Sequence, residues 1–239
     1  MSKDYLVRPL SPMRKVIAAR MSEAKRTIPH FRLKAEIVVD ELLAQRNELR
    51  QSRADSTLSL NDLFIKACAQ ALMDVPEVNV QWADDELHQF ASADISIVTA
   101  VEGGLTTPIV RKAESKSIWQ ISSEVKELTA RAARNELRMQ EILGGSFSIS
   151  NLGMYGVDEF DAIINPPQCA ILAIGAASSR CVASRDRTPR VATVMRVTLS
   201  ADHRAIDGIL AARFLTAFKS RIEAPDQIGA IPTEHECNA

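Results

Sequence analysis

Two side chains near the C-terminus, His203 and Asp207, have the types and spacing for acid–base chemistry. They belong to the stretch Thr198-Leu-Ser-Ala-Asp-His-Arg-Ala-Ile-Asp-Gly208. A neutral imidazole titrates near pH ~6.5 and can take a proton from a thiol whose pKa is about 8.5. A lone His-x-x-x-Asp-Gly is nevertheless common by chance and is often only a satisfied polar pair. Whether His203 and Asp207 have a catalytic or a structural role therefore depends on the rest of the sequence.

The elements around His203 are expected to hold it rigidly. Residues 191–199 predict a strand that ends shortly before the histidine, and residues 210–218 predict a helix that begins soon after it. A strand-to-helix junction projects a side chain from a rigid support, which suits a reactive group. Gly208 is interpreted as the residue that permits a tight backbone turn there.

Composition places the chain among ordinary globular proteins. Its 239 residues can bury a full core, and 46% of them are apolar and 25% charged. The net charge of -1 gives no electrostatic reason to expect a nucleic acid or an acidic membrane surface as partner. No apolar run approaches the ~18 residues of a membrane span, and the first residues lack the apolar core of a signal peptide. A cytoplasmic protein is expected.

The four cysteines, Cys68, Cys169, Cys181 and Cys237, are scattered without paired spacing. Zinc sites need close pairs, and a disulfide scaffold needs more cysteines in a shorter chain. Cys68 and Cys169 lie in apolar runs and are interpreted as core residues. The sequence therefore predicts no metal site.

Hydrophobic spacing and capping residues predict the other elements. We expect Ser11 to cap the first helix, Asp40 the second, and Ser59 or Asn61 the third. Helices are expected over residues 11–26, 41–52, 62–73, 116–134 and 210–218. Strands or extended runs are expected over residues 30–39, 86–90, 93–101, 105–110, 146–150, 170–176 and 191–199.

These strands and helices interleave without a regular βαβ repeat. An α/β fold with a mixed β-sheet and flanking helices fits that order better than a doubly wound sheet. Residues 1–10 are expected to form an N-terminal arm, residues 11–225 one domain, and residues 226–239 a polar C-terminal tail. No glycine-rich loop has the spacing of a dinucleotide or phosphate fingerprint.

Five stretches, including the one that contains His203, carry a resemblance to a known family. In chain order they are Met13-Arg-Lys-Val-Ile-Ala-Ala-Arg-Met21, Ile28-Pro-His-Phe31, Gly104-Leu-Thr-Thr-Pro108, Gly145-Ser-Phe-Ser-Ile-Ser-Asn-Leu-Gly153 and Ser200-Ala-Asp-His-Arg-Ala-Ile-Asp-Gly208. Together they are similar to the catalytic domain of dihydrolipoamide acyltransferases, the acyl-transferring components of 2-oxo acid dehydrogenase complexes. The family is related in fold to chloramphenicol acetyltransferase, and the resemblance covers roughly residues 9–225.

The resemblance implies a reaction and roles for two residues. His203 would deprotonate the thiol of coenzyme A, and the thiolate would attack the thioester of an acyl-dihydrolipoamide. Ser150 would donate a hydrogen bond to the oxyanion of the tetrahedral intermediate. Residues 163–175 are most similar to the branch that handles acetyl groups in the pyruvate dehydrogenase complex. The branches for branched-chain acyl and succinyl groups share most of the same framework.

The resemblance also implies supporting residues and partners. Asp207 would pair with Arg14 and hold the loop around His203, with a direct bond from Asp207 to the imidazole as the minority view. The active site would lie at the interface of a homotrimer, with His203 from one chain and Ser150 from its neighbour. The residues implied for coenzyme A are Arg46, Ser59, Asn151 and Gly175.

The acyl donor would be a lipoyl group carried on another domain or protein. The decarboxylase and dihydrolipoamide dehydrogenase components would be further partners. Family members usually carry lipoyl and subunit-binding domains ahead of the catalytic domain, whereas this chain begins almost at that domain. Its largely polar C-terminus favours a plain trimer over a large cubic or dodecahedral core. Two alternatives stay open: transfer to another small-molecule acceptor, and a non-catalytic scaffold.

Overall fold

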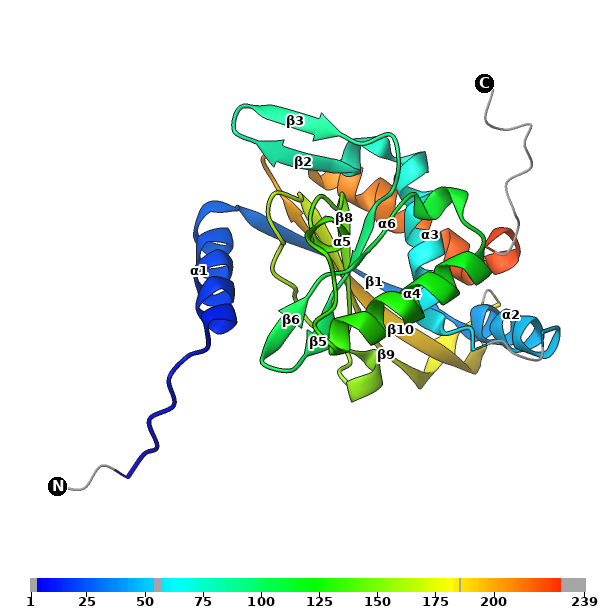
Figure 1. The fold of residues 1–239 in the computed structure, drawn as a ribbon. Coiled ribbons are helices and arrows are strands. Elements are labelled where there is room, and N and C mark those ends of the chain that lie inside the picture. The colour runs from blue at the N-terminus through cyan, green and yellow to red at the C-terminus, as the bar shows by residue number, and fades with distance from the viewer. Residues whose placement is uncertain (1–3, 54–56, 185, 229–239) are drawn as a thin grey trace.

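A mixed β-sheet is the centre of the computed structural model, which describes residues 4–53, 57–184 and 186–228 (Figure 1). Its strands are β1 (His30–Val38), β4 (Ile95–Ile97), β7 (Ile109–Val110), β8 (Phe147–Asn151), β9 (Ala170–Ala183) and β10 (Pro189–Asp202). They lie in the order β1-β10-β9-β8-β4-β7. Strands β4, β8 and β9 run parallel, whereas β1, β10 and β9 pair antiparallel and β7 pairs antiparallel with β4. The expected mixed sheet with flanking helices is confirmed.

Smaller elements surround this sheet. Two separate strand pairs are β2 (Val80–Ala83) with β3 (Glu86–Gln89), and β5 (Thr99–Val101) with β6 (Gly104–Thr106). The helices are α1 (Pro12–Thr27), α2 (Asp40–Gln51), α3 (Leu60–Asp74), α4 (Ile118–Ala133), α5 (Met139–Ile142) and α6 (Gly208–Glu223). Short 3-10 turns occur at Pro76–Val78, Ala113–Ser115, Gly153–Tyr155 and Pro225–Gln227.

The main core lies between the sheet and the helices α3, α4 and α6. Alternate strand residues face it, so Phe147 and Ile149 of β8 enter the core while Ser148 and Ser150 lie on the opposite face. The Phe147 ring contacts the ring of Phe214 from α6 at a centroid distance of 5.2 Å. This packing fixes β8 and therefore the place of Ser150.

Helix α3 is buried through most of its length, as its apolar sequence predicts. Ser59 is its cap: the Ser59 Oγ accepts from the Asp62 N–H at 3.2 Å, and the Asp62 carboxylate accepts from the Ser59 N–H at 2.8 Å. Lys66 in the same helix is fully buried, and burial lowers the pKa of its amine. Its Nζ donates to the carbonyls of Glu114 and Lys116, which offsets part of the cost of burying the amine.

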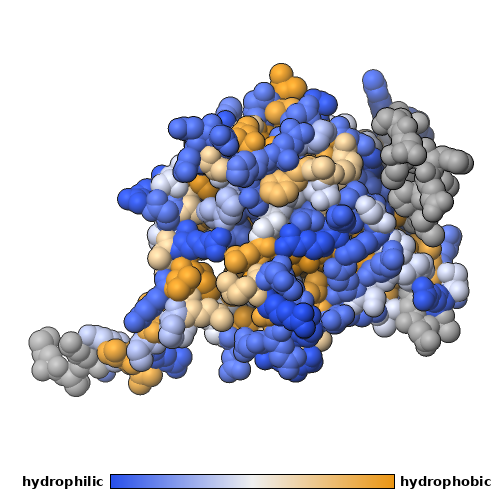
Figure 2. Space-filling model, turned by 45° about the horizontal axis from the view of Figure 1, so that its top comes forward, coloured by the Kyte–Doolittle hydropathy of each residue, from blue (hydrophilic) through white to orange (hydrophobic). Residues whose placement is uncertain are grey.

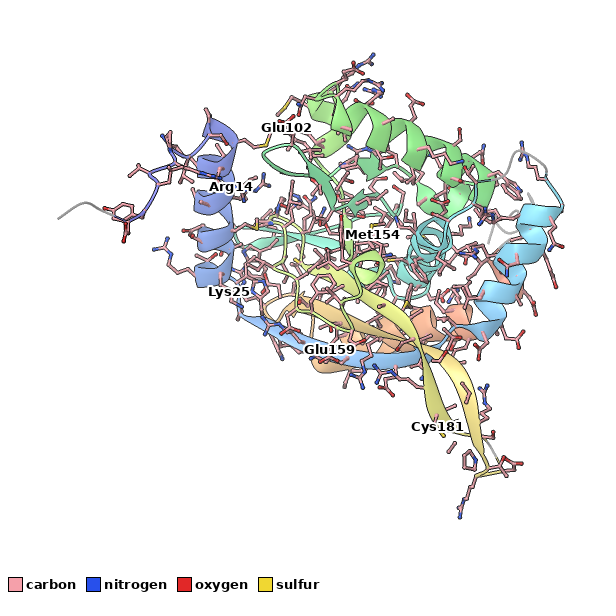
Figure 3. All side chains as sticks on the ribbon, turned by 90° about the horizontal axis from the view of Figure 1, so that it is seen from below. Arg14, Lys25, Glu102, Met154, Glu159 and Cys181 are labelled. Carbon is pink, nitrogen blue, oxygen red and sulfur yellow. The ribbon has the colours of Figure 1, made fainter. Side chains whose placement is uncertain are left out.

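A smaller apolar cluster covers part of the opposite face of the sheet. It consists of Ala24 and Ile28 from α1 and its end, Ala162 and Ile164 from the loop after Gly156, and Ile171 and Ala173 from β9. Helix α1 lies at the edge of the fold, and the described part of the N-terminal arm extends away from it (Figures 1 and 3). Figure 2 shows apolar atoms along this arm, where the side chains of Tyr5, Leu6 and Val7 are exposed.

Most expected elements are present, with physical reasons for the differences. Asp40 does not cap α2, because its Oδ1 accepts from the Thr193 N–H of β10 at 2.9 Å and Val39 occupies the cap position. Residues 93–101 break into β4 and β5. Strand β9 continues to Ala183 in a hairpin with β10 that projects from the body, with Cys181 near its end (Figure 3). Strand β2 and helix α5 were not expected.

The ends of the expected domain fall partly outside the described residues. Residues 1–3 of the arm and 229–239 of the tail are not described. Ile228 is buried in the main core, so the packed part of the chain continues at least three residues beyond the expected boundary at 225. Within residues 4–53, 57–184 and 186–228, no helix is long and apolar enough to cross a membrane.

Candidate active site

His203 lies directly after the end of β10, where the sequence places it. Its side chain is exposed, and its backbone N–H donates to the Pro29 carbonyl at 3.2 Å. The imidazole lies against the ring of Phe31, with the ring centroids 4.5 Å apart and a tilt of 51°. The backbone and the ring of His203 are therefore both supported by the start of β1.

A second support for this loop was missed by the sequence analysis. Asp202 is buried, and its carboxylate accepts from the backbone N–H and the guanidinium of Arg204 at 2.6 to 3.2 Å. The Arg204 guanidinium also lies over the ring of Trp82 from β2, at 4.3 Å from the centroid. His203 therefore sits between two residues whose side chains are fixed to each other. In the sequence, only the opposite charges on either side of His203 indicated that Asp202 and Arg204 could pair.

Asp207 caps α6, and within the described part of the chain no hydrogen bond or ion pair joins it to the His203 imidazole. Its Oδ1 accepts from the N–H groups of Ile209 and Leu210 at 2.9 and 2.8 Å. Among the described residues of one chain, no ion pair joins Asp207 to Arg14, which lies on α1 at the edge of the fold (Figure 3). The pairing of Asp207 with Arg14 does not occur within one chain, and it stays a prediction for neighbouring chains. Gly208 is the first residue of α6, has no positive φ and lies in open space, so the expected need for glycine in a tight turn is wrong.

Ser150 is far from His203 within one chain. It is 8% exposed and pairs with Ala173 of β9, which in turn pairs with Thr198 of β10. His203 comes five residues after Thr198. With about 3.3 Å per residue along a strand and about 4.8 Å between strands, the Cα atoms of Ser150 and His203 lie about 19 Å apart.

A cavity of about 500 Å³ brings together all four residues expected to bind coenzyme A. Arg46 comes from α2, Ser59 from the cap of α3, Asn151 from the end of β8 and Gly175 from β9. Arg50, one helical turn after Arg46, also lines the cavity, and it forms no ion pair among the described residues. A larger hollow of about 590 Å³ along α6 contains none of these residues.

The chemistry of the 500 Å³ cavity suits an anionic, amide-rich ligand. The Nε of Arg46 is buried without a hydrogen-bond partner in the described structure, while its Nη2 donates to Asn47. A guanidinium offers a planar fork of donors that fits a phosphate. Asn151 is oriented by the Gly153 N–H, which donates to its Oδ1 at 2.9 Å. A Cβ on Gly175 would meet the Asp158 carbonyl at 2.0 Å, so close packing requires this glycine.

The thiols and acidic groups give no metal site in the part of the chain that is described: no three metal-binding side chains cluster there. Cys68 and Cys169 are buried, as expected. Burial, with a contribution from Asp202, raises the pKa of Cys169 to about 12, so this thiol stays protonated at neutral pH although it lies close to the His203 loop.

The fold is that of the chloramphenicol acetyltransferase class. Chloramphenicol acetyltransferase shares it, with a TM-score of 0.53 at 14% identity over 86% of this chain and 92% of that one. Dihydrolipoamide acetyltransferase from Azotobacter vinelandii, studied for the catalytic roles of a serine, a histidine and an asparagine, has a TM-score of 0.90 at 28% identity and 94% coverage of both chains. The cubic core of a pyruvate dehydrogenase multienzyme complex has the same TM-score at 27% identity, again over 94% of both chains.

Sequence comparison then gives the family. The family described as 2-oxoacid dehydrogenases acyltransferase (catalytic domain) matches residues 2–230, and the chain belongs to it. The acetyltransferase component of the pyruvate dehydrogenase complex from Rickettsia bellii is 46% identical over 226 residues. That alignment covers 93% of this chain and 54% of the relative, so the chain spans about half the length of the curated relative it matches.

Proposed function

We propose that this chain transfers an acetyl group between dihydrolipoamide and coenzyme A. The observation that carries the proposal is the cavity in which Arg46, Ser59, Asn151 and Gly175 meet beside the strand of Ser150. Family membership supports the same reaction, since the relative from Rickettsia bellii is an acetyltransferase of the pyruvate dehydrogenase complex. In this proposal the adenosine phosphates of coenzyme A contact Arg46, and Arg50 is a second cation for them.

His203 acts as the general base. Its neutral imidazole takes the proton of the coenzyme A thiol, and the thiolate attacks the thioester carbonyl of acetyl-dihydrolipoamide. The carbonyl oxygen becomes negative, and the Ser150 hydroxyl donates a hydrogen bond to it. The carbon–sulfur bond to dihydrolipoamide then breaks, and the imidazolium returns its proton to the leaving sulfur. Acetyl-CoA and dihydrolipoamide are the products, and His203 is neutral again.

The two catalytic side chains come from different subunits in this proposal. A base and an oxyanion donor that serve one carbonyl must both lie within hydrogen-bond reach of the same thioester. The separation of about 19 Å between Ser150 and His203 in one chain is too large for that. A homotrimer whose sites lie between neighbouring chains provides the missing partner, and Asp207 and Arg14 then also have the opportunity to pair across subunits.

The wider assembly belongs to the same proposal. The acetyl group arrives on a lipoyl group carried by another domain or protein, and the decarboxylase and dihydrolipoamide dehydrogenase components load and reoxidise that group. One similar structure forms the cubic core of a pyruvate dehydrogenase complex, and the trimer is the unit that this proposal requires. A cytoplasmic location remains a prediction.

Acetyl transfer from acetyl-CoA to free dihydrolipoamide tests the proposal directly. Removal of a general base typically costs about 10²–10⁴-fold, so His203→Ala should lower kcat by at least two orders of magnitude. Ser150→Ala should lower it about 10²–10³-fold through loss of an oxyanion donor. His88→Ala and Ser123→Ala, at exposed positions on β3 and α4, are the matched controls and should keep the wild-type rate. A folded wild-type chain that transfers no acetyl group would refute the function.

A further inference from the structure

His30 is fixed at both ring nitrogens by backbone groups. Its Nδ1 lies 2.9 Å from the Ile28 carbonyl oxygen, and the Ile164 N–H donates to its Nε2 at 3.1 Å. A carbonyl oxygen only accepts and a peptide N–H only donates. The ring therefore carries its proton on Nδ1 and is neutral in this arrangement. The two bonds join the end of α1, the start of β1 and the loop that follows Gly156.

The residues on either side of His30 are the ones that contact His203. The Pro29 carbonyl accepts from the His203 N–H, and the Phe31 ring lies against the His203 imidazole. His30 itself pairs with Asp202 across β1 and β10. A displacement of the His30 backbone would therefore move both supports of His203 together.

We propose that His30 is a positioning residue for His203: as a neutral Nδ1–H imidazole bonded to Ile164, it locks the segment Pro29–Phe31 against the His203 loop. This inference rests on the proposed role of His203 as general base. His30 touches no reacting atom and acts through Pro29 and Phe31. A base displaced by about 1 Å can lose up to about 10²-fold in rate, so the lock has catalytic consequences.

The loop that His30 holds is also fastened elsewhere to the same side of the fold. The Arg20 guanidinium of α1 donates to the Pro166 carbonyl at 2.6 Å, and Arg32 of β1 pairs with Asp161 at 3.1 Å. Both bonds lie at the surface, whereas the bond from Ile164 to His30 adjoins the small apolar cluster that contains Ile28 and Ile164. Lys34 of β1 pairs with Glu159 of the same loop at 2.9 Å. His30 is thus an inner fastening of a loop that surface ion pairs also hold.

The lock is expected to open at acid pH. Burial lowers the pKa of His30 from its usual value; the bond to Ile28 and the charge of Asp202 from β10 oppose this shift, while Lys25 of α1 and Arg32 of β1 add to it. Asp161, from the loop, is engaged by Arg32. Protonation would place a hydrogen on Nε2 facing the Ile164 N–H, and this bond would be lost. The rate should therefore fall in an acid step that lies below the usual histidine pKa of ~6.5 and that depends on His30.

Two substitutions separate the two bonds of His30. An asparagine amide takes the place of Nδ1 and can keep the local bond to Ile28, but it is too short for Ile164. A glutamine amide reaches the place of Nε2, can accept from the Ile164 N–H, and does not titrate. We expect His30→Asn to lower kcat about tenfold with an unchanged KM for coenzyme A, and His30→Gln to keep most of the rate while losing the acid step that depends on His30. His88→Asn and His88→Gln, on exposed β3, are the matched controls.

A direct readout does not depend on activity. The chain has four histidines, so their imidazole nitrogens can be resolved by NMR. We expect an Nδ1–H tautomer for His30 at neutral pH, and shifted His203 signals in His30→Asn but not in His30→Gln. If His30→Asn does not fold, Phe31→Leu replaces it and should lower kcat about tenfold. Wild-type rate profiles in the folded variants, or unchanged His203 signals, would overturn the positioning role. A wild-type chain without acetyl transfer would refute the function, and the His203 signals would still test the lock.

Discussion

At the scale of single residues, Asp207 has one structural use that is observed and a second that is predicted. Its Oδ1 accepts hydrogen bonds from the two N–H groups that start α6. Its charge is predicted to pair with Arg14 of another chain. Asn and Asp are about equally good caps. The cap depends on the oxygen, whereas the ion pair depends on the charge, so substitution can separate them.

We expect Asp207→Ala to lower the free energy of unfolding by about 1 kcal/mol, because α6 loses its cap. Asp207→Asn should keep that stability. If the charge also pairs with Arg14 between subunits, Asp207→Asn and Arg14→Gln should each weaken the trimer, and the double variant should be no weaker than either. Urea unfolding and sedimentation measure the two effects. Additive losses in the double variant would contradict the pair.

Candidate reactive residues could be predicted from the sequence, but their surroundings could not. His203 and Ser150 are predicted from motifs that occur in a fixed order, and their roles stay predictions. The support of His203 by Phe31, and of Arg204 by Trp82, joins residues more than a hundred positions apart. Such contacts depend on the strand order β1-β10-β9, which local periodicity does not specify.

At the scale of elements, the N-terminus of α3 combines a helix cap with a wall of the proposed binding cavity. Ser59 is the cap of α3, and it also lines the 500 Å³ cavity. Ser117 is an equivalent cap on α4, with a capping box completed by Gln120, and it does not line the cavity. The chain therefore contains a matched pair of caps, of which one adjoins the site.

Both Ser59→Ala and Ser117→Ala should lower the free energy of unfolding by about 1 kcal/mol, since each leaves a helix without its cap. Only Ser59→Ala should raise the KM for coenzyme A, because only Ser59 faces the proposed ligand. Denaturation curves and steady-state kinetics on the two variants provide the comparison. An equal KM in both would remove Ser59 from the binding site and leave it as a cap alone.

The ends of helices and strands were predictable where neighbouring residues in the sequence determine them. They were less predictable where contacts with distant strands determine them. Ser11 caps α1 as expected, since the Arg14 N–H donates to its Oγ at 3.2 Å. Asp40 looks like an equally good cap, but its carboxylate is used by Thr193 of a distant strand. Strand β9 is longer than the apolar run from which it was predicted. Beyond Ala176 its residues are no longer all buried, and pairing with β10 keeps the backbone extended.

At the scale of the whole molecule, one chain contains every proposed catalytic residue but no complete site. The coenzyme A cavity lies at the strand end that carries Asn151, and His203 lies at the opposite end of β10. The register of three strands fixes that separation, and a rotation of side chains cannot bridge about 19 Å. Assembly is therefore a requirement of the proposed chemistry.

Mixed trimers test this requirement. His203→Ala and Ser150→Ala chains, each nearly inactive alone, are unfolded together in equal amounts and refolded. If each site takes His203 from one chain and Ser150 from its neighbour, about one quarter of the sites regain both intact residues, and the mixture recovers about one quarter of the wild-type rate. Chains that carry both substitutions, refolded with either single variant, give no complete site and form the control. A mixture no more active than the average of its parents would show that His203 and Ser150 do not act together across the interface.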